Sequence, residues 1–245
     1  MTTRREFLAV SAGALAAQAT GLHATVMKSP KPLRILRINP SGEDVPAGRQ
    51  IVLQFDRAVV PIGRMERTAD EIPIKVTPDP GCEWRWLNTS ALACQLGEKN
   101  ALVPSTRYQM QIDPGIIAED GGTLARTHRH TFITERPKVT SQWFETWTSP
   151  GTPHVRITFD QIVTEESAAG HLHFELPNGT QVPVTLDRKE GWNETTWIVV
   201  PARELPLDEQ VSLSVEPGIE PVKGNEPGIE DRKLVVFPTF PEHRF

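Results

Sequence analysis

The sequence predicts an all-β protein in which two tandem immunoglobulin-like antiparallel β-sandwich domains follow an export signal. Three observations indicate this fold. Short runs of alternating apolar and polar residues lie between turn residues, in a chain of 245 residues with 22 prolines and 17 glycines. No helical periodicity is evident after the N-terminal segment. The strand pattern of the first half recurs about 104 residues later.

The N-terminal segment, residues 1–24, is predicted to be a signal peptide. It contains an arginine pair, two apolar residues and then a weakly apolar run through residue 17, and it resembles the twin-arginine export signal. The residues that carry this signal are Arg4, Arg5, Phe7 and Leu8. Two small-residue patterns, at 17–19 and 22–24, fit the cleavage site. The sequence therefore predicts a periplasmic or secreted bacterial protein.

Charge and hydropathy restrict the class of partner. The net charge is -5 and the isoelectric point is about 5.8, which argues against nucleic acid or an anionic membrane as the main partner. No run after the signal approaches the length of a membrane-spanning helix, so we expect no membrane span after signal removal.

The first domain is predicted to span residues 33–135, after a Lys/Pro-rich linker at residues 25–32. Its strands are expected at 33–38, 51–55, 82–94 (as a hairpin), 108–112 and 130–134. Residues 72–76 contain Pro73, which lacks a backbone N–H, and are therefore expected to form an edge strand if they form one.

The second domain is predicted to span residues 136–245 because the same pattern returns in order. The matching segments are 51–56 with 155–160, 102–116 with 205–219, and 131–134 with 236–239. The second copy lacks cysteines, so the cysteine-containing hairpin is interpreted as an elaboration of the first domain.

That hairpin alternates large apolar residues with charged ones, and Asn88 to Ser90 has turn chemistry. An odd-length turn centred on Asn88 gives the pairs Trp86–Ser90, Trp84–Leu92 and Cys82–Cys94. Directly opposed cysteines lie within disulfide range, and an exported protein favours oxidation, so we predict a Cys82–Cys94 disulfide. An even-length turn would shift this register and separate the cysteines.

Other side chains are weighed as catalytic or metal ligands and are not assigned to a site. His171, His173 and Glu175 would share one strand face, where a solvated surface is the simpler interpretation than a Zn²⁺ site. Asp56 and Asp160 occupy equivalent positions after a core phenylalanine, where turn capping is expected instead of acid–base chemistry. We predict no catalytic residues, no metal ligands, no cofactor and no enzymatic activity.

Several segments resemble the N-terminal region of the bacterial α2-macroglobulins. They are residues 45–61, the Trp84-Arg85-Trp86 hairpin through Cys94, and residues 104–108, and the likeness extends over residues 33–245. The resemblance implies macroglobulin-like sandwich domains of an exported protease inhibitor. In many members of that family a Cys-x-Glu-Gln thioester captures the protease, but neither Cys82 nor Cys94 is followed by that motif.

The sequence thus leaves three functional hypotheses. The first is a non-enzymatic scaffold or interaction module that resembles the N-terminal part of such an inhibitor but lacks its bait and thioester, with a protease or an envelope protein as partner. The second is a stand-alone cell-envelope module that binds a protein or glycan through its loops or an edge strand. The third is an enzyme or a metal protein that uses the strand with His171 and His173.

Overall fold

The computed structural model describes residues 30–61, 73–98 and 100–241. The predicted export signal at Arg4, Arg5, Phe7 and Leu8 lies outside these residues. One compact unit spans Lys31–Phe245. In the described part of the chain, no helix is both long enough and apolar enough to cross a bilayer.

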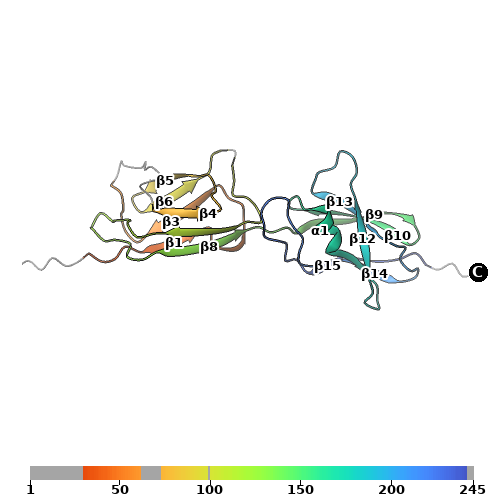
Figure 1. Cartoon of the computed structure of the whole chain (residues 1–245). Helices are drawn as coiled ribbons and strands as arrows, with labels where there is room; N and C mark the ends of the chain where they lie inside the picture. Colours follow the sequence, from red (N-terminus) through yellow and green to blue (C-terminus); the bar gives the residue numbers. More distant parts are fainter. Residues whose placement is uncertain (1–29, 62–72, 99, 242–245) are drawn as a thin grey trace, which may run out of the picture. The chain divides into compact units, whose positions relative to one another are not determined.

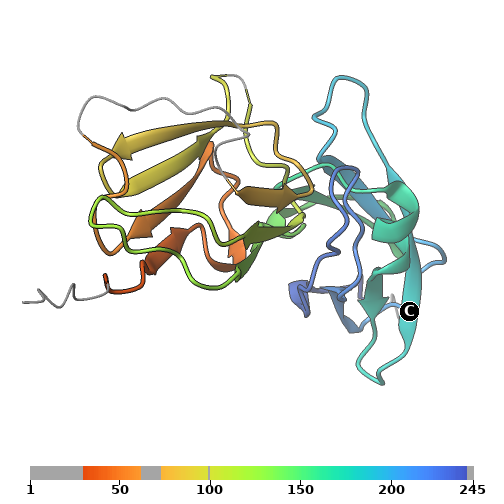
Figure 2. The same ribbon diagram turned by 60° about the vertical axis from the view of Figure 1, so that its left-hand side comes forward.

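The first eight strands form two four-stranded layers, which Figure 2 shows in orange to green and which we call the first sandwich. One sheet has the order β1-β3-β6-β5 and the other β2-β8-β7-β4. All pairs are antiparallel except β2 with β8, which is parallel. The strands are β1 (Ile35–Asn39), β2 (Gly42–Val45), β3 (Gln50–Phe55), β4 (Ile74–Thr77), β5 (Glu83–Asn88), β6 (Ala91–Gln95), β7 (Arg107–Ile112) and β8 (His128–Thr134).

Alternation along the strands places the core of the first sandwich between its two sheets. In β3, Ile51 and Leu53 are fully buried, and in β7, Met110 and Ile112 are buried as well. Because these two strands belong to different sheets, their inner faces meet in one hydrophobic cluster. The expected edge position of the strand after Pro73 is confirmed, since β4 ends its sheet.

The remaining strands form a seven-stranded antiparallel sheet of order β15-β14-β11-β12-β13-β10-β9, which we call the second sandwich. The start of β12 pairs with β11 and its end pairs with β13, so β12 passes from one layer to the other. Its elements are β9 (Val139–Ser149), β10 (Thr152–Phe159), α1 (Glu165–Gly170), β11 (Leu172–Glu175), β12 (Gln181–Asp187), β13 (Thr196–Pro201), β14 (Gln210–Val215) and β15 (Arg232–Pro238).

The predicted all-β antiparallel fold is confirmed, with local exceptions. The expectation of no helix after the signal is wrong, because α1 lies beside β11 and β12 (Figure 1) and buries Ala168. A helix of six residues is too short to show a 3.6-residue period in the sequence. Strand β9 was not predicted, because register shifts against β10 interrupt its alternation. The domain boundary after residue 135 stays a prediction.

Candidate functional site

The hairpin β5–β6 carries the disulfide expected from the sequence. Cys82 and Cys94 are bonded, with Cα atoms 5.3 Å apart. The expected register is wrong by two residues, since Trp84 faces Cys94 and Trp86 faces Leu92. A two-residue shift keeps every side chain on its face, so the cysteines become diagonal neighbours and remain close enough to bond.

The turn of this hairpin explains the register. The chain reverses at Thr89 and Ser90, and the pairing shifts between Trp86 and Asn88. The Ser90 N–H donates to Asn88 Oδ1 over 2.9 Å, and the Ser90 carbonyl accepts the Phe55 N–H over 2.8 Å. Asn88 therefore closes a shorter turn instead of standing at its centre.

The hairpin side chains belong to the core of the first sandwich. Trp86 is 3% exposed, and its ring centroid lies 5.8 Å from that of Phe55. Cys94 is fully buried. This packing, together with the disulfide, gives the stretch a structural role.

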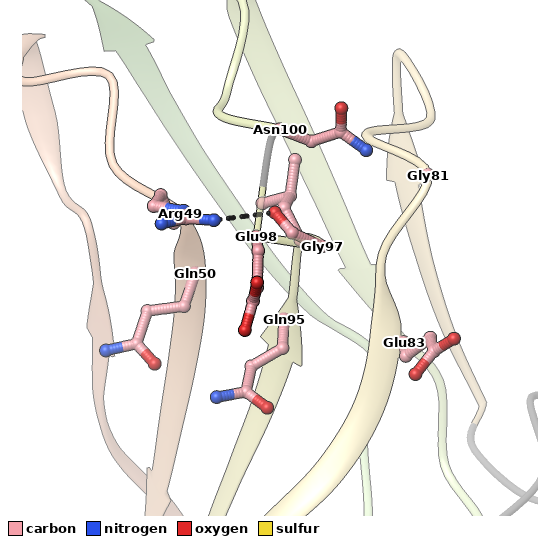
Figure 3. A pocket seen from close by; sticks show the side chains of 9 residues that line it. Arg49, Gln50, Gly81, Glu83, Gln95, Gly97, Glu98 and Asn100 are labelled. Atoms are coloured by element: carbon pink, nitrogen blue, oxygen red, sulfur yellow. Dashed lines mark hydrogen bonds between the residues drawn. The ribbon is translucent and has the colours of Figure 1, made fainter.

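The outer face at the open end of the hairpin borders a polar groove of about 530 Å³ (Figure 3). Glu83, Gln95 and Gln50 lie opposite one another on β5, β6 and β3, so they form one row across three strands. Arg49 donates to the Gly97 carbonyl over 3.0 Å at the rim. Sequence reasoning did not find this groove, because its residues meet only through strand pairing.

A second group of charged residues joins the first sandwich to the second. Arg136 is 7% exposed, and its guanidinium contacts Glu43 at 2.8 Å, Asp44 at 3.1 Å and Glu226 at 3.8 Å. Arg107 forms two bonds with Glu226, of 2.7 and 3.0 Å. Burial lowers the pKa of Arg136, but the bond to Glu43 and the three nearby carboxylates raise it by more, so the group stays charged.

Backbone hydrogen bonds accompany these ion pairs. The Ser105 carbonyl accepts the N–H groups of Asn225 and Glu226, each over 2.8 Å. The Gln161 side chain donates to the Glu135 carbonyl over 3.0 Å and accepts a bond from the Ser105 hydroxyl. At the neighbouring position 224 a Cβ would collide with the Ser105 carbonyl, and φ is +91°, so glycine is needed there. We call this set of contacts the junction.

The histidine strand does not form the shared face considered in the sequence. Leu172 and Phe174 point inward as expected, but His171 precedes β11 and its Nδ1 donates to the Ser167 carbonyl. His173 is only 9% exposed, so the expected solvated face is wrong there, and its Nδ1 lies 3.7 Å from Glu216. Within residues 30–61, 73–98 and 100–241, no group of three His, Cys, Asp or Glu side chains is placed to hold a metal.

The two equivalent aspartates make the same backbone contacts. Asp56 accepts the Arg34 N–H, and Asp160 accepts the Lys138 N–H, each over 3.1 Å. The pKa values shift oppositely. A side-chain bond from Arg57 holds the pKa of Asp56 below its usual range, whereas burial raises the pKa of Asp160.

We expect opposite pH effects from replacing these aspartates with asparagine. Asp56→Asn should lower the free energy of unfolding by about 1 kcal/mol at pH 7, because the ion pair with Arg57 is lost. The pKa of Asp56 is depressed in the folded state, so this loss should shrink as pH falls through that pKa.

Asp160→Asn, the matched control, should stabilise the protein slightly at pH 7, because an amide accepts the same backbone bond without a buried charge. The raised pKa of Asp160 favours folding at low pH and loses that effect as pH rises. The gain should therefore vanish in acid. Urea unfolding of both variants between pH 3 and pH 7 measures this, and equal pH profiles would contradict it.

Comparison with known proteins gives only distant structural likenesses. No family model and no curated protein matches the chain. An L,D-transpeptidase from Mycobacterium smegmatis matches at 12% identity over 64% of this chain and 76% of its own, with a TM-score of 0.29. Native alpha-2-macroglobulin from Escherichia coli, spanning domains MG0-NIE-MG1, matches at 14% identity over 85% of this chain and 72% of its own, with a TM-score of 0.31.

The N-terminal part of the bacterial S-layer protein SbsC matches at 14% identity over 82% of this chain and 44% of its own, with a TM-score of 0.28. We draw no functional argument from likenesses at these TM-scores. What the structure itself defines is the class: an all-β protein of sandwich architecture that contains one disulfide.

Proposed function

We propose that this protein is a non-enzymatic scaffold or interaction module of the bacterial cell envelope, exported by the twin-arginine route to the periplasm or beyond. The junction is the observation that carries the proposal. A scaffold must hold its binding surfaces at a fixed separation, and a buried arginine with three carboxylates and paired backbone bonds resists bending at the joint.

The disulfide also supports a binding role instead of covalent capture. A thioester needs a free thiol beside a glutamine side chain, and Cys82 and Cys94 are consumed by their mutual bond. The bait and thioester of the macroglobulin inhibitors are therefore not part of the proposal. The protein would act as a structural or recognition element that resembles their N-terminal region, with a protease or an envelope protein as its partner.

Export is tested by replacing both Arg4 and Arg5 with lysine. We expect at least a tenfold loss of protein from the periplasmic fraction, because the translocase reads the arginine pair and not its charge alone. Arg34→Lys together with Arg37→Lys, on the first sandwich, is the matched control and should leave fractionation unchanged. Unaltered export of the double-lysine signal would remove the twin-arginine proposal.

The polar groove favours a second candidate, a stand-alone envelope module that binds a protein or glycan. Amide and carboxylate groups in a row offer donors and acceptors to peptide groups or sugar hydroxyls. The test uses purified protein and isolated cell-envelope sacculi in a sedimentation assay. If the groove binds glycan, Gln50→Ala with Gln95→Ala should abolish co-sedimentation, and Gln109→Ala with Gln111→Ala should not. Sedimentation that is equal in both variants would contradict this candidate.

A further inference from the structure

The far end of the second sandwich repeats the backbone geometry of the junction end of the first. Ser105 and Asp208 are both non-glycine residues with positive φ, +50° and +59°. The Ser105 N–H donates to the Glu135 carbonyl over 3.0 Å, and the Asp208 N–H donates to the Phe240 carbonyl over 2.8 Å. Each bond joins the loop before a strand to a residue that follows the last strand of its sandwich.

The neighbouring threonines repeat as well. Thr134 Oγ1 accepts the Thr106 N–H over 2.9 Å, and Thr239 Oγ1 accepts the Glu209 N–H over 2.9 Å. In return, the Thr134 N–H donates to the Thr106 carbonyl and the Thr239 N–H to the Glu209 carbonyl. The two loops therefore share one backbone conformation and one hydrogen-bond pattern, although their sequences differ.

In the first sandwich, the loop at Ser105 is the place where a loop of the second sandwich binds. Its positive φ turns the Ser105 carbonyl outward, where it accepts two successive N–H groups from the loop at Asn225 and Glu226. Glycine at 224 lets that loop approach the backbone closely. The site is specific to a partner that presents consecutive backbone donors at a loop with no side chain beside them.

The equivalent end of the second sandwich offers the same backbone acceptor beside exposed apolar side chains. Within residues 30–61, 73–98 and 100–241, the Asp208 carbonyl accepts no hydrogen bond. Leu207 on one side and Phe240 on the other are 40% and 41% exposed. A backbone acceptor flanked by two large apolar side chains is a surface that gains from being covered.

The side chains define how a partner would differ from the loop seen at the junction. Gln210 and Pro241 stand where the first sandwich has Arg107 and Arg136, so the partner loop needs no acid in the role of Glu226. The Asp208 carboxylate replaces the Ser105 hydroxyl and favours a donor such as a side-chain amide or a cation.

We propose that Leu207, Asp208 and Phe240 form a docking end for a further β-sandwich module. That module would give two successive backbone N–H groups to the Asp208 carbonyl and cover Leu207 and Phe240. The inference rests on the proposed scaffold function and names its surface, but its test reads docking in purified protein. The docking proposal can therefore be contradicted while the export proposal is supported, and the reverse is also possible.

The probe is the one sandwich known to fit such an end, the protein's own second sandwich. A second copy of residues 136–245 is joined directly after Phe240, which reproduces the Glu135–Arg136 link and restores Arg136 beside Glu226. Among the described strands, each sandwich pairs only within itself and has its own hydrophobic cluster, so we expect the appended copy to fold. Near-UV circular dichroism reports its folding, since four of the six tryptophans lie in residues 136–245.

The readout is thiol labelling of the variant Leu207→Cys, made in the original second sandwich. Both native cysteines are bonded, so the introduced side chain is the reactive thiol. Maleimide labelling should be about tenfold slower in the extended chain than in the unextended one, because a directly joined module has a high effective concentration. Leu36→Cys, at a position that is 64% exposed in the first sandwich, should react equally in both chains.

Three outcomes of the labelling experiment decide the proposal. Slow labelling that returns to the unextended rate when the appended copy carries Gly224→Val supports docking by the junction mode, because the new side chain would block the approach. Equal labelling of the Leu207→Cys thiol in the extended and unextended chains overturns the proposal. Slow labelling that persists with Gly224→Val also overturns it, since the cover would then be nonspecific.

Discussion

Arg136→Ala is expected to lower the free energy of unfolding by about 3 kcal/mol, because it removes a buried cation from the three carboxylates around it. Glu226 is 14% exposed and would keep Arg107 as its partner, but Asp44 and Glu43 would lose their shared contact. The like charges then repel one another without a cation between them. Equilibrium urea unfolding, followed by tryptophan fluorescence, measures the change.

The same substitution should also change the shape of the transition. With the junction weakened, the first and second sandwiches are expected to unfold in two steps instead of one. Arg136→Lys keeps the charge but not the planar fork, so its effect should be intermediate. Arg37→Ala removes an exposed arginine and serves as the control. A loss at Arg136 no larger than that at Arg37 would show that the junction contributes little to stability.

Cys82→Ala is expected to cost about 2–3 kcal/mol, because a disulfide that closes a loop with a separation of 12 residues restricts the unfolded chain. Cys94 remains as a buried thiol, which a core accepts as a small apolar group. The effect should therefore come from the lost bond and not from a cavity. Urea unfolding in oxidising buffer measures it.

The double variant Cys82→Ala, Cys94→Ala tests that origin. It should be destabilised about as much as Cys82→Ala with only a small added packing cost. Reduced wild-type protein should behave like Cys82→Ala. Mass spectrometry of the exported protein should show Cys82 bonded to Cys94, and free thiols there would contradict both the bridge and its expected contribution.

Much of the fold follows from local alternation in the sequence. Strands β3 and β7 were predictable because Ile51 and Met110 stand in uninterrupted period-two runs. Strand β2 was not, since Glu43 and Asp44 give it the composition of a loop, and its parallel pairing with β8 joins residues far apart in the chain. Local sequence patterns do not show which distant strand will form hydrogen bonds with the backbone of a given strand.

The hairpin shows the same limit at finer scale. The face of each residue was predictable, because Trp84 and Trp86 alternate with charged residues. The register was not, because it depends on whether Asn88 closes the turn with Ser90 or stands at its centre. The disulfide prediction was nevertheless correct, because cysteines at diagonal positions of a hairpin are also close enough to bond.

By itself, the sequence determined the all-β class, the inward face of the main strands and the cysteine pairing, because side-chain alternation and turn residues act over a few positions. Only the tertiary structure decided the junction and the polar groove. Arg136 meets Glu226 through the approach of a distant loop, and strand pairing places Gln95 opposite both Gln50 and Glu83. The same holds for the docking end, where the conformation of Asp208 and not its residue type matches Ser105.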